Sequence, residues 1–193
     1  MEDNRWRSYY QALYQVAIAL GESLEPEGAL QALVQGVVET LDLRAASIRL
    51  LQDGGLLEPV AAHGLSPAYL QKGPVELRKS PIDREALRGA PVQIANVATD
   101  PRFEYPHEAQ REGIVSAVFV PLIARGDSIG VLRAYTATQR PFTADEIELL
   151  TALANLGALA IANARLYQLC IRDQKMTAEA LWNFRLPDDL VGR

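Results

Sequence analysis

The sequence predicts a single α+β domain whose strands pair in antiparallel hairpins. Helical patterns occupy both ends of the 193-residue chain, and short alternating runs fill its middle. Two hairpin turns stand out, Asp53-Gly54-Gly55 and Arg125-Gly126-Asp127, and turns of this kind join antiparallel neighbours. Hydrophobic residues make up 49% of the chain, so one domain of this size can bury a proper core.

Two helices are predicted before the first strand. Between residues 6 and 24, apolar side chains recur every three or four positions, which places one apolar seam along a helix. A second helix follows Pro26, because proline suits an early helical position whose N–H would have no partner within the helix. Its predicted buried face consists of Leu30, Leu33, Val34, Val37, Val38 and Leu41.

Five strands and two short helices are predicted in the middle of the chain. The strands cover residues 46–52, 57–63, 92–97, 115–123 and 128–136. Pro59 favours a sheet-edge position for the second strand, since a lost backbone N–H costs little there. Residues 66–88 are rich in loop and end in a helix that begins at Ser80-Pro81 and stops at Gly89. The other short helix, residues 106–112, is closed by Gly113.

The last predicted element is a long helix. Thr143-Ala144-Asp145-Glu146 forms a capping box at its start. Apolar residues continue from 147 through 171, which allows a helix of more than about 25 residues. Beyond it, residues 182–193 contain Pro187 and are expected to fray. We therefore divide the chain into an N-terminal signalling and dimerisation helix (1–24), a central domain (25–171) and a C-terminal helical extension and tail (172–193).

Composition and charge argue against several kinds of partner. The net charge of −5 and the pI near 5.1 disfavour a nucleic-acid surface, which needs clustered lysine and arginine. Residues 1–7 lack the apolar core of a signal peptide, and no run of about 18 uninterrupted apolar residues predicts a membrane span. The single cysteine, Cys170, can form neither an internal disulfide nor a multi-thiolate metal site. The simplest compartment is the cytoplasm.

Several runs in the second half of the chain resemble the GAF domain family. Residues 113–122 (GIVSAVFVPL) resemble the family's penultimate strand, and residues 130–136 (GVLRAYT) resemble its last strand. Residues 142–146 (FTADE) and 160–167 (AIANARLY) resemble the entry and the exit of its closing helix. Asp100-Pro101-Arg102, with Tyr105-Pro106 after it, is similar to a subgroup of bacterial GAF domains. The resemblance covers roughly residues 10–170.

This resemblance implies both a fold and a role. The implied fold is a central antiparallel β-sheet of five to six strands, GAF/PAS-like, with helices on one face and loops plus short helices on the other. The implied role is that of a bacterial sensory or regulatory domain, which catalyses nothing and binds a small molecule between the sheet and the loops. Such domains act as inputs of larger signalling proteins, so we expect an effector in a neighbouring domain or in another protein.

The ligand classes of the family differ in the residues they need. Covalent bilin attachment and methionine-sulfoxide reduction need pocket cysteines, whereas Cys170 lies near the far end of the closing helix. Cyclic nucleotide remains an open alternative, because Phe142 and Asp145-Glu146 match the nucleotide-binding members but their Asn-Lys pair is missing. His63 and His107 form no metal-ligand pattern, so we expect neither a metal nor another cofactor.

Strand alternation indicates a candidate ligand site on the face of the sheet away from the long helices. The sheet residues on that face include Ser47, Arg49, Arg133 and Tyr135, with Ser116 or Ala117 between them, and Arg102, Tyr105 and His107 lie in the loop above. Converging arginines in a partly dry cleft favour an anionic ligand such as a carboxylate or phosphate. In the alternative, Arg49 and Arg133 pair with acidic residues of the loop (Asp83, Glu85 or Glu104) and hold it down.

The terminal helices indicate a homodimer. Their apolar residues are Trp6, Tyr10, Leu13, Ala17, Leu20 and Leu24 at one end and Leu159, Leu166, Tyr167, Leu169 and Cys170 at the other. One small sheet cannot cover them all, so we predict a parallel homodimer whose helices pass ligand-induced shifts onward. The alternatives are packing within one subunit, or a ligand-free structural dimerisation module. A GAF-type enzyme is disfavoured, because no nucleophile with its base and no glycine-rich phosphate loop is present.

Overall fold

The computed structural model describes residues 2–22, 26–73 and 75–183. In chain order its elements are α1 (Glu2–Glu22), α2 (Pro26–Leu41), β1 (Ala45–Gln52), β2 (Leu56–His63), α3 (Pro67–Leu70), β3 (Val75–Glu76), α4 (Pro81–Ala86), β4 (Val92–Ile94), α5 (Pro106–Arg111), β5 (Ser116–Ala124), β6 (Asp127–Thr136) and α6 (Ala144–Asn183).

The strands form one six-stranded antiparallel sheet in the order β3-β2-β1-β6-β5-β4, which confirms the predicted fold class. At its centre β1 pairs with β6, although the two strands are far apart in the sequence. Gly130 of β6 allows this pairing, because a Cβ there would collide with the carbonyl oxygen of Arg49. On the other side of β2, β3 pairs only with Leu56 and Leu57, so within the described chain Pro59 faces no further strand.

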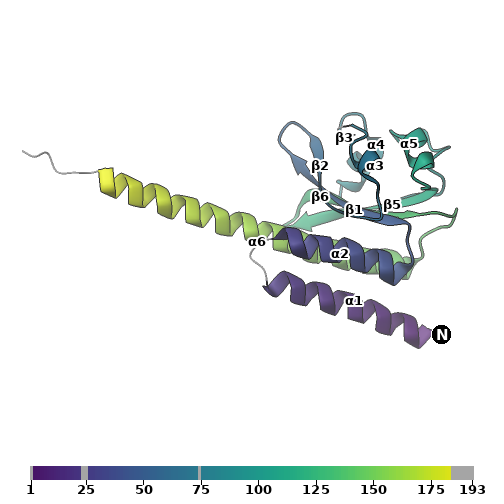
Figure 1. Ribbon diagram of the computed structural model, residues 1–193, viewed down its shortest axis with the longest axis horizontal. Coiled ribbons are helices and arrows are strands. Elements are labelled where there is room, and N and C mark those ends of the chain that lie inside the picture. Colours follow the sequence, from purple (N-terminus) through teal and green to yellow (C-terminus); the bar gives the residue numbers. More distant parts are fainter. Residues whose placement is uncertain (1, 23–25, 74, 184–193) are drawn as a thin grey trace, which may run out of the picture.

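Helices cover one face of the sheet and the connection between β2 and β5 covers the other (Figure 1). The core on the helix side joins Leu33 and Val34 of α2 to Leu132 of β6 and to Leu150 and Leu153 of α6. A second core on the opposite face joins the sheet to the connection, through Ile82, Ile94, Phe119, Val131 and Tyr135. The two faces of the sheet are therefore buried by different layers, as the alternation of β1 and β6 predicted.

One residue departs from that alternation. By strict alternation along β6, Ile129 would share a face with Val131 and Tyr135, but it packs against the core on the helix side. The pairing of β5 with β6 shifts by one residue between Leu122 and Ile123, opposite Ile129. A bulge inserts an unpaired residue and reverses the side on which the chain points, so Ile129 follows the opposite face.

The region predicted as loop-rich contains two small elements that were not expected, α3 and β3. Helix α3 begins after Ser66, whose hydroxyl accepts a hydrogen bond from the backbone N–H of Tyr69 at 3.1 Å. Ser66-Pro67 is thus a cap and a first-position proline, the same signal that identified α4. The predicted strand at 92–97 is shorter than expected and ends at Ile94. Leu24 and Pro187 lie outside the described residues.

Helix α6 has 40 residues and continues past residue 172, where a separate extension was placed. Its second half projects away from the sheet (Figure 1). The span Ala144–Met176 is long and apolar enough to cross a membrane, judged by length and composition alone. Many of its apolar residues, including Leu149, Leu153 and Ile161, pack in the core against the sheet, so packing accounts for much of that composition.

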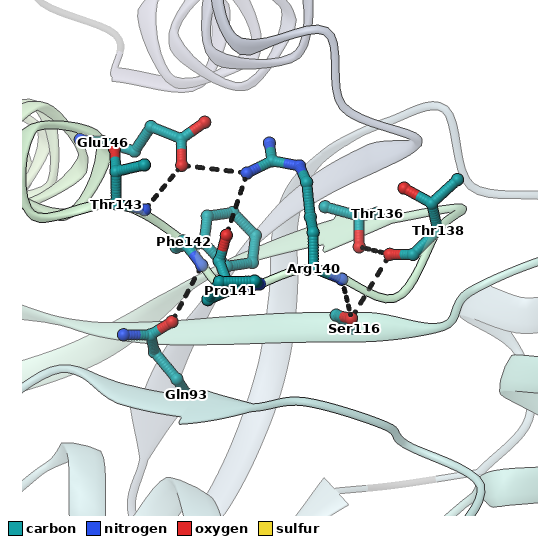
Figure 2. Close-up of polar contacts among 9 residues, drawn as sticks. All are labelled: Gln93, Ser116, Thr136, Thr138, Arg140, Pro141, Phe142, Thr143 and Glu146. Carbon is teal, nitrogen blue, oxygen red and sulfur yellow. Dashed lines mark hydrogen bonds and ion pairs between the residues drawn. The ribbon is translucent and has the colours of Figure 1, made fainter.

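The predicted capping box is present at the start of α6 (Figure 2). The hydroxyl of Thr143 accepts a hydrogen bond from the N–H of Glu146 at 3.3 Å, and the Glu146 carboxylate accepts one from the N–H of Thr143 at 2.8 Å. Arg140 also donates to this carboxylate at 2.9 Å. Reciprocal bonds of this kind satisfy backbone donors that have no partner within the helix.

The cap should contribute measurably to stability. Thr143→Ala is expected to lower the free energy of unfolding by about 1 kcal/mol, because one backbone donor at the helix start loses its acceptor. Thr151→Ala is the matched control: its hydroxyl donates to the carbonyl of Ile147 inside α6 and caps no helix end. Urea denaturation followed by circular dichroism compares the two variants. Equal losses in both would contradict a capping role for Thr143.

Candidate functional site

A small cavity lies between the sheet and the connection of residues 64–113, which we call the roof. Its volume is about 20 Å³, counted as the space that the centre of a water molecule can occupy. This suffices for about one water. The lining residues are Tyr69, Lys72, Val75, Ser80, Ile82, Asp83, Phe103, Glu104 and Tyr105 from the roof, with Phe119 and Arg133 from the sheet. The roof therefore contributes most of the wall, including Lys72, and the sheet contributes Phe119 and Arg133.

Arg133 joins the sheet to the roof. Its guanidinium lies 2.7 Å from the Asp83 carboxylate, and only 6% and 2% of the two side chains are exposed. The same Asp83 oxygen accepts a hydrogen bond from the hydroxyl of Ser80. Burial acts to lower the pKa of Arg133, but the attraction of Asp83, Tyr135 and Tyr69 and the hydrogen bond to Asp83 together outweigh it, and the net shift is upward. Strand β6 and helix α4 are thus tied together by a buried charged pair.

Several buried polar atoms at this site have no hydrogen-bond partner within the described residues. They are Nε of Arg133, Oδ1 of Asp83 and Oε2 of Glu104, all on residues that line the cavity, and the hydroxyl of Ser47 on the same face of β1. Buried polar groups in folded proteins nearly always have partners, supplied by the protein, by water or by a ligand. The cavity wall therefore offers donors and acceptors for groups that the chain itself does not provide.

Lys72 places a second cation at the cavity. Its ammonium lies 3.7 Å from the centre of the Tyr69 ring and 5.4 Å from that of Tyr105, and it donates to the carbonyl of Tyr69 at 3.2 Å. Burial and the repulsion of Arg49 and Arg133 lower the pKa of Lys72 to about 7. Burial also raises the pKa of Glu104. Both groups are therefore easier to neutralise than an exposed lysine or glutamate.

The structure brings four of the seven predicted ligand residues to the cavity or directly beside it. Arg133 and Tyr105 line the cavity. Arg49 and Tyr135 are buried beside it: Arg49 donates to the carbonyl of Leu57 at 2.9 Å, and Tyr135 packs edge-on against Tyr69. Burial and the neighbouring Arg133 lower the pKa of Arg49.

The other three predicted residues lie elsewhere. Arg102 pairs with Asp100 at 2.7 Å and with Glu85 at 2.9 Å. His107 is exposed on α5. Ser116 donates to the carbonyls of Ala95 and Thr138 and accepts from the N–H of Arg140, at the end of the sheet next to α6 (Figure 2). The alternative prediction, that an arginine of the sheet pairs with Asp83, is confirmed for Arg133.

Sequence reasoning missed Lys72, Tyr69 and Phe103 as parts of this site. Tyr69 and Lys72 lie on or just after α3, and the cap at Ser66 was the one signal that a helix positions them. Nothing in the local sequence of Lys72 distinguishes it from a surface lysine. Its neighbour Gly73 has φ +136 and faces the hydroxyl of Tyr105, so the loop turns back over the cavity at this point.

On the helix side, α1 has two apolar faces. Tyr9, Ala12 and Val16 are buried against the protein's own helices, whereas Trp6 and Tyr10 are 50% and 68% exposed. The exposed face also includes Ala17, Tyr14 and Ile18, of which the last two were not predicted. Leu13 and Leu20 are partly buried against the helix-side core. Farther along the chain, the projecting α6 exposes Leu159, Leu166, Tyr167, Leu169 and Cys170.

Within residues 2–22, 26–73 and 75–183, no group of three or more histidine, cysteine, aspartate or glutamate side chains is arranged to hold a metal ion. An open groove of about 450 Å³ separates α1 from α2, with mostly small and uncharged residues in its walls. A second open pocket of about 240 Å³ lies between α3 and α5. The charged cavity beneath the roof remains the most chemically distinctive site.

An antiparallel sheet with helices on one face and a roofed, charged cavity on the other defines a class of small α+β domains. The model of the GAF domain family matches residues 23–162, and the chain belongs to this family. The match includes the sheet, the roof and the first part of α6.

The chain is similar to two longer signalling proteins. It is 27% identical over 172 residues to a Nif-specific regulatory protein of Herbaspirillum seropedicae, an alignment that covers 86% of this chain and 31% of the relative. It is 29% identical over 170 residues to an uncharacterized sensor-like histidine kinase of Chloroflexus aurantiacus, covering 86% of this chain and 27% of that protein. The chain therefore spans less than one third of the length of these relatives.

Solved structures share the fold at low sequence identity. The GAF domain from a phosphoenolpyruvate-protein phosphotransferase of Coxiella burnetii superposes with a TM-score of 0.75 at 22% identity, covering 84% of this chain and 98% of that chain. A free methionine-R-sulfoxide reductase of Neisseria meningitidis, solved with its substrate, gives a TM-score of 0.69 at 17% identity, with 82% and 91% coverage. At these identities the likeness concerns the fold alone, and the fold accommodates both an enzyme and domains of signalling proteins.

Proposed function

We propose that this chain is a non-catalytic sensory domain, which binds a small anion between the sheet and the roof and relays binding through α1 and α6 in a parallel homodimer. The observation that carries the proposal is the buried Arg133 at the cavity. Its Nε has no hydrogen-bond partner in the described residues, and its guanidinium pairs with the roof carboxylate of Asp83. An anion bound at Nε would compete with Asp83 and alter how the roof is held.

A continuous network leads from the strands to the start of α6, which supports the relay (Figure 2). The side chain of Gln93 in β4 accepts a hydrogen bond from the N–H of Phe142 at 2.9 Å, and Ser116 of β5 accepts one from Arg140 at 3.2 Å. Arg140 in turn donates to Glu146 in the first turn of α6. A displacement in the sheet would therefore reach α6 through a short, hydrogen-bonded connection.

Helix α1 starts beside α6 and completes the output surface. Arg5 lies 2.7 Å from Asp145, so the two helices begin at the same end. The exposed apolar residues of α1 and those of α6 form long stripes with no cover within the described chain. Burying apolar area contributes roughly 25 cal/mol per Å² before association costs, which supports a second copy as the cover. A helix bundle of two subunits is a common device for passing on small shifts.

The relatives support an effector beyond this domain. The chain spans 31% of a Nif-specific regulatory protein and 27% of a sensor-like histidine kinase. We propose that the ligand-induced shift in α6 regulates an effector domain or protein, and that the domain works in the cytoplasm. The single cysteine supports this compartment, because extracellular domains often rely on disulfides.

Two other functions are distinguished by specific observations. A cavity this small also suits a ligand-free structural dimerisation module, in which the roof stays closed on the sheet. A sulfoxide reductase needs cysteines at the pocket to attack and resolve the substrate, whereas the single cysteine of this chain, Cys170, is exposed on α6. We therefore favour a binding domain over an enzyme of the same fold.

A thermal-shift screen tests the binding proposal. Acetate, 2-hydroxy acids, dicarboxylates, phosphate and phosphate monoesters serve as probes, and at about 100 times its Kd a ligand should stabilise the fold by about 2.7 kcal/mol. Arg133→Lys keeps the charge opposite Asp83 but loses the guanidinium fork, so we expect binding to weaken about tenfold. Arg102→Gln is the matched control and should bind as the wild type does. If no molecule that carries an anionic group shifts the melting temperature, the binding proposal is wrong and the structural module is favoured.

A further inference from the structure

The cavity beneath the roof combines opposite charges with aromatic walls, which an anion alone would not use. Besides Arg133, its walls hold the two carboxylates of Asp83 and Glu104. Four aromatic side chains complete them: Tyr69, Phe103, Tyr105 and Phe119. Carboxylates and aromatic faces both attract organic cations, whereas a guanidinium attracts a carboxylate. The site is therefore suited to a ligand that carries both charges.

The buried atoms without hydrogen-bond partners also favour a ligand that carries both charges. Arg133 contributes one donor, Nε, while Asp83 and Glu104 contribute two acceptors, Oδ1 and Oε2. The side chains of Arg133 and Asp83 are both more than nine-tenths buried. A bound carboxylate would accept from Nε but leave both acceptors without a donor. A ligand that adds an ammonium beside its carboxylate provides donors for both.

Lys72 marks where such an ammonium would lie. Its own ammonium is 3.7 Å from the centre of the Tyr69 ring and reaches Tyr105 at 5.4 Å, in the manner of a cation in an aromatic cage. Lys72 is half-buried and follows α3, on a loop that turns at Gly73. Its side chain can therefore leave the cavity without a change in the sheet.

We infer that the ligand is a zwitterion of the 2-amino acid class, whose carboxylate binds Arg133 and whose ammonium displaces the Lys72 ammonium and donates to the unpartnered oxygens of Asp83 and Glu104. The inference rests on the proposed binding function and specifies its ligand. Charge balance supports it. With Lys72 inside, three cations (Arg49, Lys72 and Arg133) face two carboxylates; with an amino acid in its place, three cations face three anions.

The titration of Lys72 makes the exchange easier. Burial, Arg49 and Arg133 lower its pKa to about 7, against the weaker opposing attraction of Glu104 and Glu108. Near neutral pH a large share of Lys72 is thus uncharged, and its withdrawal from the aromatic faces gives up little cation attraction.

The test compares amino acids with their deaminated and decarboxylated analogues. The standard L-amino acids, at about 10 mM, are screened by thermal shift against the wild type and Lys72→Met. Each hit is then measured by calorimetry beside the carboxylate that lacks the amino group and the amine that lacks the carboxylate. Lys79→Met, on the same roof but paired with Glu76 at the surface, is the control and should match the wild type.

The two kinds of ligand should respond in opposite directions. Lys72→Met is expected to bind the amino acid about tenfold more tightly, because the internal competitor is gone. It should bind the deaminated carboxylate about tenfold more weakly, because one cation is lost. Glu104→Gln should weaken binding of the amino acid about tenfold without weakening binding of the carboxylate, since only the ammonium uses that carboxyl group and the loss of its charge removes a repulsion.

The outcomes separate this inference from the function on which it rests. The inference of a zwitterionic ligand is overturned if the deaminated carboxylates bind as tightly as the corresponding amino acids. It is also overturned if Lys72→Met weakens the binding of both kinds of ligand. In either case the proposal of anion sensing stands. If neither amino acids nor carboxylates bind to the wild type or to Lys72→Met, both proposals are overturned. Binding of the decarboxylated amine as tightly as the amino acid would overturn the role of Arg133 in holding the ligand.

Discussion

Arg133→Met is expected to lower the free energy of unfolding by about 3–5 kcal/mol, because it leaves the carboxylate of Asp83 buried without its counter-ion. Asp83 is 1% exposed, and its carboxylate accepts from Arg133 and from the hydroxyl of Ser80. Desolvating an unpaired carboxylate costs far more than losing an exposed ion pair. Urea denaturation at one fixed protein concentration measures the loss.

The double variant Arg133→Met/Asp83→Leu separates the cost of the unpaired charge from the cost of lost packing. Replacing both members of a buried pair by apolar residues is often close to neutral, so most of the stability should return. Arg102→Gln breaks the exposed pairs with Asp100 and Glu85 and should change the free energy of unfolding by less than about 1 kcal/mol. A double variant as unstable as Arg133→Met would show that packing, not charge, ties the roof to the sheet.

Dimer formation should depend on the exposed face of α6. Leu159→Glu combined with Leu166→Glu is expected to weaken self-association by at least roughly 100-fold, because each buried leucine contributes about 1.5–3 kcal/mol and the substitutions add like charges across the interface. Both side chains are exposed in the single chain, so the fold itself should be preserved. Sedimentation velocity at tens of micromolar protein distinguishes the dimer from the monomer.

Leu56→Glu is the control for the dimer test. Leu56 is another exposed leucine, but it lies at the start of β2, away from α1 and α6. Its substitution should leave the sedimentation coefficient unchanged. A wild-type chain that sediments as a monomer under these conditions would refute the dimer, and a monomeric Leu56→Glu would show that a different surface mediates it.

Local patterns predicted those elements whose residues decide their own conformation. Pro26 begins α2, and the pair Thr143 and Glu146 begins α6, because caps and early prolines act on backbone groups within one turn. Strand alternation correctly placed Arg133 and Tyr135 on the face opposite Leu132, since successive side chains of a strand point to opposite sides. Asp83 was foreseen as a possible partner of Arg133 for the same reason.

Other features depended on contacts between distant segments. Tyr9 is more buried than Leu13 because of how α1 rests on α2 and α6, although leucine is the more apolar residue. The two-residue strand β3 exists because Leu56 and Leu57 offer it a partner. The position of Ile129 depends on a shift in the pairing with β5. None of these can be read from neighbouring residues alone.

By itself, the sequence determined the order of the elements other than α3 and β3, the two faces of the central strands and the capping box of α6. Periodicity and turn chemistry act over a few residues, and the chain carries them wherever it folds. The tertiary structure alone decided that Lys72 lies over Tyr69, that Asp83 and not Glu85 meets Arg133, and that little space remains between them. Those outcomes depend on how the roof settles on the sheet, which is a property of packing between segments far apart in the chain.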